Sequence, residues 1–141
     1  MNYPAVYKVK TEQETIRIAD EFSSVLKLGE VVALKGDLGA GKTFFVKAVL
    51  KNMGITNVNS PSFAIVYEYS GQHKVNHFDF YRINKVGELF DIGFEEYISN
   101  NEAITFIEWA DLFPEILPKH RIDIDIKIID SFTREIIIRK Q

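Results

Sequence analysis

The chain has 141 residues, of which 46% are hydrophobic and 26% charged, and this composition predicts a single globular domain over residues 1–141. Its 17 lysine and arginine residues are dispersed among 20 acidic ones, for a net charge of −3, which argues against autonomous binding to nucleic acid. The absence of cysteine excludes disulfides and thiolate metal sites, and the absence of a membrane-length apolar run or an apolar signal core favours a cytoplasmic protein.

Strands and helices alternate in the first part of the chain. Thr11 and Glu14 form a capping-box pattern at the start of a helix, in which Thr11 caps the helix and Glu14 reaches back to it. The apolar run EVVALKG, which ends in glycine, is typical of a buried parallel strand. The expected order is a strand over 5–10, a helix that stops at Gly29, a strand over 30–36 and a helix over 43–53.

The second part of the chain is richer in strands. Gly87 and Gly93 interrupt a helical pattern over 84–99, and residues 121–128 alternate as a strand with one wet face does. Together the elements predict an α/β three-layer domain, similar to P-loop NTPases, with a mixed, mostly parallel sheet and a C-terminal antiparallel hairpin. The expected strands are 63–69 and 74–80, joined by a tight SGQH connection, then 103–109, 121–128 and 134–140.

The segment GDLGAGKT, residues 36–43, fits the phosphate-binding loop pattern G-x-x-x-x-G-K-T and lies between an apolar strand and a helix, as the motif requires. Its glycines let consecutive backbone N–H groups face one anion, and the following helix adds its positive N-terminal end. Lys42 supplies a cation for the β- and γ-phosphates, and the Thr43 hydroxyl can ligate Mg²⁺. The motif therefore predicts a nucleotide site that uses Mg²⁺.

Two carboxylates follow apolar strands, at the edge where ligands gather in open α/β sheets. Asp79 lies in HFDFYR, and Glu108 lies in ITFIEW, where Thr105 interrupts the apolar run of a Walker-B-like strand. Either carboxylate could help to hold Mg²⁺ or position the attacking water. Both could also be ordinary capping or solvated carboxylates, but beside a phosphate loop the functional interpretation is the stronger one.

Four other side chains near these motifs have simpler interpretations. His73 and His77 lie four residues apart on a predicted strand, a separation of about 13 Å, which is too far for two ligands of one metal. We interpret both as surface or packing residues. Trp109 fits core packing as well as a gate over the site, and Arg82 fits a surface cation as well as a phosphate partner.

The remaining motifs discriminate among classes of nucleotide-binding protein. A GTPase reads guanine with N-K-x-D, but NKVG has Gly87 in place of the aspartate, so guanine specificity is unsupported. A small-molecule kinase usually has an arginine-bearing lid, and no segment of this sequence has that character. An ATPase and an ATP-gated binding module remain.

Five blocks of the sequence together resemble the TsaE family of bacterial P-loop ATPases, which are needed to make threonylcarbamoyladenosine in tRNA. Ser62 stands where that family usually has threonine and keeps the hydroxyl, while Phe80 and Ala110 are further mild departures. In chain order the blocks are GDLGAGKT (36–43), SPSF (60–63) followed by VYEY, HFDFYR (77–82), ELFDIGFEEY (88–97) and IEW (107–109).

The resemblance implies an Mg²⁺-dependent ATPase that is weak alone and acts with TsaB and TsaD, so that tRNA is contacted only through the complex. It implies catalytic roles for Lys42, Asp79 and Glu108, in which Asp79 positions or activates the hydrolytic water. Thr43 and Glu108 would ligate the metal. An ATP-gated binding module with little turnover and a small-molecule kinase are kept as alternatives.

The resemblance also implies which residues bind ATP. Ser62 would lie near the γ-phosphate in a switch-like segment, and Arg134 would approach the nucleotide from the late hairpin. Residues around Thr11–Thr15 are a candidate for adenine contacts, because family members often carry EET-like residues there. The implied nucleotide-binding set is Asp37, Leu38, Gly39, Ala40, Gly41, Lys42, Thr43, Phe44, Ser62 and Arg134.

Overall fold

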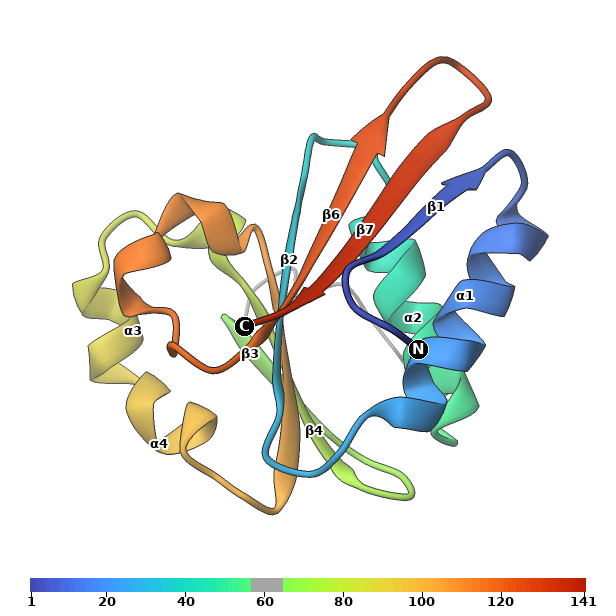
Figure 1. Ribbon diagram of the computed structural model, residues 1–141. Helices are drawn as coiled ribbons and strands as arrows, with labels where there is room; N and C mark the ends of the chain where they lie inside the picture. The colour runs from blue at the N-terminus through green and yellow to red at the C-terminus, as the bar shows by residue number, and fades with distance from the viewer. Residues whose placement is uncertain (57–64) are drawn as a thin grey trace.

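The computed structural model describes residues 1–56 and 65–141, which form a seven-stranded sheet with helices on both faces (Figure 1). The strands are β1 (Ala5–Val9), β2 (Val31–Gly36), β3 (Val66–Ser70), β4 (Lys74–Asp79), β5 (Ala103–Glu108), β6 (Ile122–Ile128) and β7 (Arg134–Lys140). The helices are α1 (Glu12–Val25), α2 (Lys42–Asn52), α3 (Gly87–Asp91) and α4 (Phe94–Ile98). Short 3₁₀ helices are η1 (Phe80–Arg82), η2 (Ala110–Leu112) and η3 (Pro114–Ile116).

The sheet has the order β1-β7-β6-β2-β5-β4-β3. Its four central strands, β6, β2, β5 and β4, pair in parallel, while β3, β7 and β1 add antiparallel pairs toward the two edges. The expected α/β fold, with a mixed sheet and an antiparallel β6–β7 hairpin, is therefore confirmed. Because parallel strands end at one edge, the C-terminal ends of β2, β4 and β5 lie together there.

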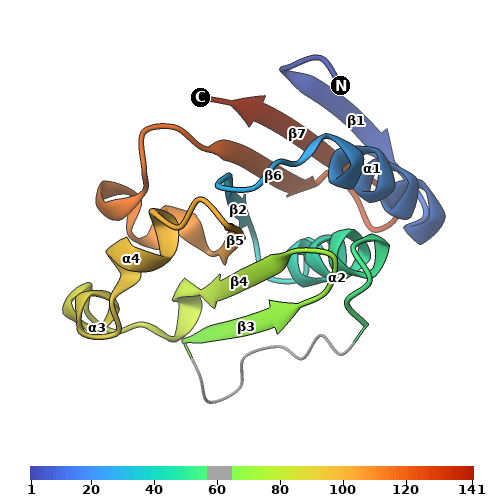
Figure 2. The ribbon, with the colours of Figure 1, turned by 90° about the horizontal axis from the view of Figure 1, so that it is seen from below.

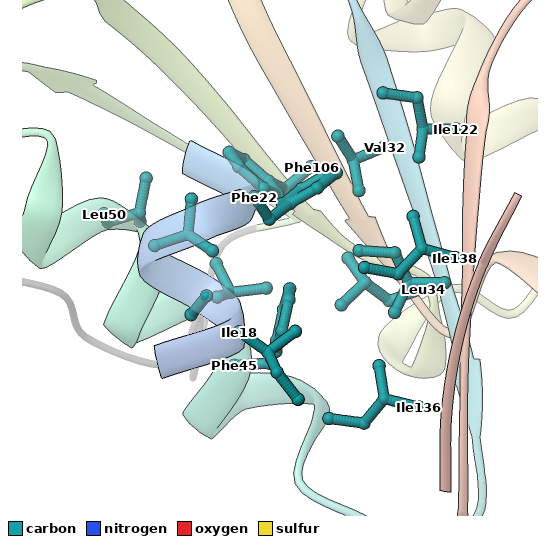
Figure 3. Packing of buried hydrophobic residues seen from close by; sticks show 14 of the residues in the cluster. Ile18, Phe22, Val32, Leu34, Phe45, Leu50, Phe106, Ile122, Ile136 and Ile138 are labelled. Carbon is teal, nitrogen blue, oxygen red and sulfur yellow. The ribbon is translucent and has the colours of Figure 1, made fainter. Parts of the chain in front are cut away.

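Helices α1 and α2 cover one face of the sheet, and α3 and α4 lie on the other face (Figures 1 and 2). Under α1 and α2, the fully buried rings of Phe22 and Phe45 lie 6.0 Å apart between centroids and pack over the sheet (Figure 3). On the opposite face the ring of Phe78 packs edge-on against that of Phe94, with 5.1 Å between the ring centroids. All six residues of strand β5 are buried, so the end of this strand, at Glu108, is held in a fixed position.

Local elements agree with the sequence patterns except at their ends. Thr11 caps α1 by accepting from the Glu14 amide at 3.1 Å, but the Glu14 carboxylate accepts from the amide of Lys10 rather than that of Thr11. Helix α1 ends at Val25, before the expected stop at Gly29. Gly93, at φ 78°, separates α3 from α4, whereas Gly87 begins α3 instead of breaking a helix.

The expectation of a wet polar face on β6 is wrong at Asp123. This side chain is buried, and its charge is compensated by Arg121, which donates to it at 2.8 Å, and by Lys35, 3.8 Å away. The first residues of the strand expected over 63–69 lie outside the described residues. Within the described ranges, no helix combines the length and the apolarity needed to cross a membrane.

Candidate functional site

The glycine-rich loop connects the end of β2 to the start of α2, as the motif requires. A Cβ on Gly36 would lie 2.5 Å from the carbonyl oxygen of Ile126, so only glycine allows this close approach of β2 to β6. Gly39 and Gly41 have φ values of 81° and 109°, and a Cβ on either would meet nothing within 4 Å. The loop thus turns through positive φ with open space on its outer side, which suits backbone binding of an anion.

Lys42, the first residue of α2, points back into the loop. Its Nζ donates to the carbonyl oxygens of Gly36 and Asp37, the latter at 3.0 Å. The side chain is only 5% exposed, and burial lowers the pKa of Lys42, while nearby carboxylates, Glu108 first among them, oppose that shift. The ammonium group is therefore held at the loop by contacts that a phosphate can replace.

Trp109 covers Lys42. The Nζ atom lies 3.9 Å from the centroid of the Trp109 ring, a cation–π contact. The tryptophan backbone has φ 57°, an unfavourable left-handed conformation for a bulky residue, and its ring also packs on Tyr81 at 4.9 Å. The contact with Lys42 is what a gate over the site would make. The half-buried ring also packs against the apolar core on the side of the sheet that carries α3 and α4, as the packing interpretation requires.

Glu108 and Thr43 meet at the junction of the sheet with α2. Glu108 ends β5 and is 2% exposed. The Thr43 hydroxyl donates to Glu108 Oε1 at 2.6 Å. A hydroxyl and a carboxylate in contact are hard oxygen ligands of the kind that Mg²⁺ prefers.

This pair fits a magnesium ion that takes most of its ligands from phosphate and water. Within residues 1–56 and 65–141, no group of three or more His, Asp or Glu side chains is placed to hold a metal alone. A shared site between Thr43, Glu108 and a bound nucleotide is consistent with that finding. The assignment of both residues as metal ligands stays a prediction.

Asp79 lies directly beside Glu108, because the two are register partners in the parallel β4–β5 pair. Its carboxylate accepts from the Tyr81 amide at 3.0 Å, which caps η1. Burial raises the pKa of Asp79, the Tyr81 amide lowers it, and the charge of Glu108 raises it further. The structure thus places a half-buried carboxylate of raised pKa next to the position expected for the metal.

Replacing Asp79 by asparagine is expected to stabilise the folded protein at neutral pH. The raised pKa means that the folded chain binds this proton more tightly than the unfolded chain does. The contribution of Asp79 to stability is therefore greatest below its unfolded pKa, about 4, and is lost as pH rises through its folded pKa. Asparagine keeps the cap on Tyr81 without burying a charge.

Thermal unfolding of the wild type and the Asp79→Asn variant measures this effect. We expect the variant to melt a few degrees higher at neutral pH, with a difference that shrinks as the buffer is acidified. An Asp91→Asn variant, altered at an exposed carboxylate on α3, is the control and is expected to melt as the wild type does. A lower melting temperature for Asp79→Asn at neutral pH would contradict the prediction.

His77 is the functional candidate that sequence reasoning missed. It is fully buried, and its Nε2 lies 2.5 Å from Glu108 Oε2. The interpretation of His77 as a surface or packing residue is therefore incomplete, whereas His73 is exposed as expected. The available signal was strand alternation, which places His77 on the same face of β4 as Asp79.

A cavity of about 280 Å³ lies beside the loop and extends to the first helix and the late hairpin. Loop residues from Gly39 to Gly41 and Phe44 form one wall, and Arg134 lies in another. Thr11 and Thr15 also line the cavity, in the segment expected to reach adenine. The fold thus brings together three stretches that are distant in the sequence.

Three other expectations concern Ser62, Arg82 and the tip of the loop. Ser62, expected near the γ-phosphate, lies outside the described residues. Arg82 is exposed at the end of η1, and within residues 1–56 and 65–141 no hydrogen bond or ion pair ties its side chain to the loop. Asp37 and Leu38 lie exposed at the tip of the loop, as residues that face an incoming ligand would.

Comparison with protein families gives one match that spans most of the chain. The model of the family described as "Threonylcarbamoyl adenosine biosynthesis protein TsaE" matches residues 9–136. Proteins named tRNA threonylcarbamoyladenosine biosynthesis protein TsaE are similar as well. The Bacillus subtilis protein is 40% identical over 132 residues, covering 92% of this chain and 82% of its own. The Rickettsia typhi protein is 34% identical over 139 residues, covering 96% and 95%.

A solved structure shares the fold. The crystal structure of Bacillus subtilis YdiB superposes with a TM-score of 0.82 at 34% sequence identity. The match covers 100% of this chain and 88% of that one. The likeness therefore extends over the whole α/β architecture.

Proposed function

Because the chain belongs to the TsaE family, which takes part in threonylcarbamoyladenosine biosynthesis, we propose that it is an Mg²⁺-dependent ATPase that serves this tRNA modification. The observation that carries the proposal is the contact between Thr43 and Glu108 at 2.6 Å, with Lys42 at the adjacent loop. A P-loop lysine, a hydroxyl and a strand-end carboxylate are the groups that a bound Mg²⁺–nucleotide requires.

The residues divide the work of hydrolysis among them. Loop N–H groups and Lys42 bind the phosphates and stabilise negative charge on the γ-phosphoryl group as it is transferred. Thr43 and Glu108 would hold Mg²⁺, which would supply positive charge to offset that of the β- and γ-phosphates. Asp79 accepts a hydrogen bond from water. The water oxygen bonds to the γ-phosphorus and its proton passes to Asp79, while the bond from the γ-phosphorus to the bridging oxygen breaks and that oxygen leaves with ADP. The raised pKa of Asp79 improves it as a proton acceptor.

The cavity beside the loop is proposed to receive the base and sugar. Apolar side chains, among them Phe44 and Ile136, offer surface to an aromatic ring, and Arg134 offers a cation near the phosphates. Arg134 donates to the carbonyl oxygens of Asp130 and Thr133, at 3.0 and 3.3 Å, so its guanidinium is held beside the turn that joins β6 to β7. We propose adenine as the base, because the sequence lacks a guanine-reading motif.

The proposed partners are TsaB and TsaD, with TsaD as the subunit that transfers the threonylcarbamoyl group. The net charge of −3 and the absence of a basic run support contact with tRNA only through that complex. In this proposal ATP hydrolysis is a conformational step that supports repeated cycles of the transferase, and ATP is the substrate of this chain.

Phosphate release from ATP by the purified chain tests the proposal. We expect slow release with Mg²⁺, none above background when EDTA removes the metal, and faster release when TsaB and TsaD are added. GTP is the control nucleotide and is expected to be a poorer substrate. Mg²⁺-independent release, or none with the partners present, would refute the ATPase assignment, and transfer of phosphate to a metabolite would favour a kinase.

One observation favours a second function, that of an ATP-gated binding module. Lys42 is engaged with Gly36, Asp37 and the Trp109 ring, so nucleotide binding requires these contacts to change. Such a rearrangement can control docking even if turnover matters little. The two functions differ in whether hydrolysis is needed after ATP has bound.

A further inference from the structure

Glu108 is held from two sides. Thr43, from α2, donates to Oε1, and His77, from the neighbouring strand β4, contacts Oε2. The last torsion of a glutamate side chain is broad, so an unrestrained carboxylate rotates and exchanges its two oxygens. Two hydrogen bonds from two different elements remove that freedom and leave Oε1 directed at the threonine hydroxyl.

The hydrogen that joins His77 to Glu108 belongs to Nε2, because a carboxylate oxygen accepts and the ring nitrogen donates. The other ring nitrogen, Nδ1, is buried and has no hydrogen-bond partner in the described part of the chain. An unpaired buried polar atom costs free energy. Asn76, in the same strand, also carries unpaired polar atoms, so the contact of Nε2 with Glu108 is what distinguishes His77.

We propose that His77 is a positioning residue that orients Glu108 toward Thr43 and thereby sets how tightly Mg²⁺ is held with the nucleotide. The inference rests on the proposed function, since it assigns the Thr43–Glu108 pair to the metal. His77 touches neither metal nor nucleotide in this account and acts only through the Glu108 carboxylate. Partners of this outer kind commonly govern the affinity of a metal site.

The test compares His77→Leu, which removes the donor, with His77→Gln, whose amide nitrogen replaces Nε2. Calorimetry measures binding of the non-hydrolysable analogue adenylyl imidodiphosphate in EDTA and at increasing Mg²⁺. In EDTA we expect His77→Leu to bind the analogue with wild-type affinity. With Mg²⁺, we expect the variant to need a roughly tenfold higher metal concentration to reach half of the increase in affinity that Mg²⁺ produces. His77→Gln is expected to recover most of the difference.

Asn76→Leu is the matched control. Asn76 is also fully buried in β4, its side-chain nitrogen and oxygen have no hydrogen-bond partner among the described residues, and alternation directs it to the opposite face from His77. Replacing it changes a buried polar residue of the same strand without touching Glu108, so its Mg²⁺ requirement is expected to be that of the wild type. An equal shift in Asn76→Leu would show general damage and overturn the assignment of His77.

A second measurement uses only the wild-type protein and so does not depend on whether a variant folds. In proton NMR the His77 Nε2–H resonance is expected to shift when Mg²⁺ is added to the nucleotide complex, and to stay in place when Mg²⁺ is added alone. A resonance that does not respond, or a His77→Leu variant with an unchanged Mg²⁺ requirement, overturns the positioning role while leaving the ATPase proposal standing. A wild type whose nucleotide affinity gains nothing from Mg²⁺ overturns both.

Discussion

A Lys42→Ala variant is expected to lose kcat for ATP hydrolysis by roughly 10²–10³-fold, the usual effect of removing one donor that stabilises transition-state charge. ATP affinity is expected to fall as well, by about tenfold or more, because a charge-assisted contact contributes about 1.5–3 kcal/mol. The position of Lys42 accounts for the size of the expected effect. Lys42 is the cation whose Nζ reaches the carbonyl oxygens of the loop itself.

Phosphate release and calorimetry on the same preparation measure the two effects. Lys47→Ala is the control, since Lys47 lies in the same helix, is exposed and does not line the cavity beside the loop. Circular dichroism verifies that both variants are folded. Retention of full activity in Lys42→Ala would show that the loop is not the hydrolytic site.

Asp79→Asn is expected to separate binding from hydrolysis. We expect kcat to fall by about 10²–10⁴-fold, the range for loss of a general base, with ATP affinity within roughly twofold of the wild type. Asparagine retains the Tyr81 cap, so the geometry of the strand end is kept while the negative charge is lost. The same variant is expected to be more stable than the wild type, which is the usual relation between a strained catalytic group and folding.

Rapid-quench measurement of a single turnover tests this prediction directly, because it reports the chemical step apart from product release. The control is Asp91→Asn, whose exposed carboxylate on α3 lies away from the loop, and its rate is expected to be unchanged. If Asp79→Asn hydrolysed bound ATP at the wild-type rate, Asp79 would have only a structural role as the cap of η1.

The parts of the site that the sequence predicts are those encoded locally. The glycine spacing of residues 36–43 is a contiguous motif, and Asp79 and Glu108 each end a recognisable apolar strand. Parallel pairing then requires both carboxylates to meet at one edge, as their register partnership shows. The β6–β7 hairpin was predictable for the same reason, since both strands and the turn are adjacent in the chain.

The features that sequence reasoning missed depend on pairing between distant segments. His77 meets Glu108 only because β4 and β5 pair with one particular register, and no local pattern states that register. The contact of Lys42 with Trp109 depends on an unusual φ of 57° that a tryptophan rarely adopts. Asp123 alternates like a solvated residue but is buried, and its charge is paired with Arg121 and with Lys35 of the neighbouring strand β2.

Arg134 illustrates an intermediate case. Its place at the start of the last strand was predictable, but its entry into the cavity beside the loop follows from the strand order, in which β7 and β6 lie next to β2. The resemblance to the TsaE family supplied that expectation, since composition and periodicity do not contain it. A role for Arg134 in nucleotide binding stays a prediction.

Repeated threonylcarbamoyladenosine formation in a reconstituted system is the most direct test of ATP hydrolysis as the useful output of this chain. The assay combines tRNA, TsaB, TsaD and either the wild type or Asp79→Asn, and counts modified tRNA per complex over time. We predict that Asp79→Asn, although it binds ATP, does not sustain repeated rounds. A variant that binds ATP, fails to hydrolyse it and still supports many rounds at the wild-type rate would contradict the account and establish an ATP-gated binding module instead.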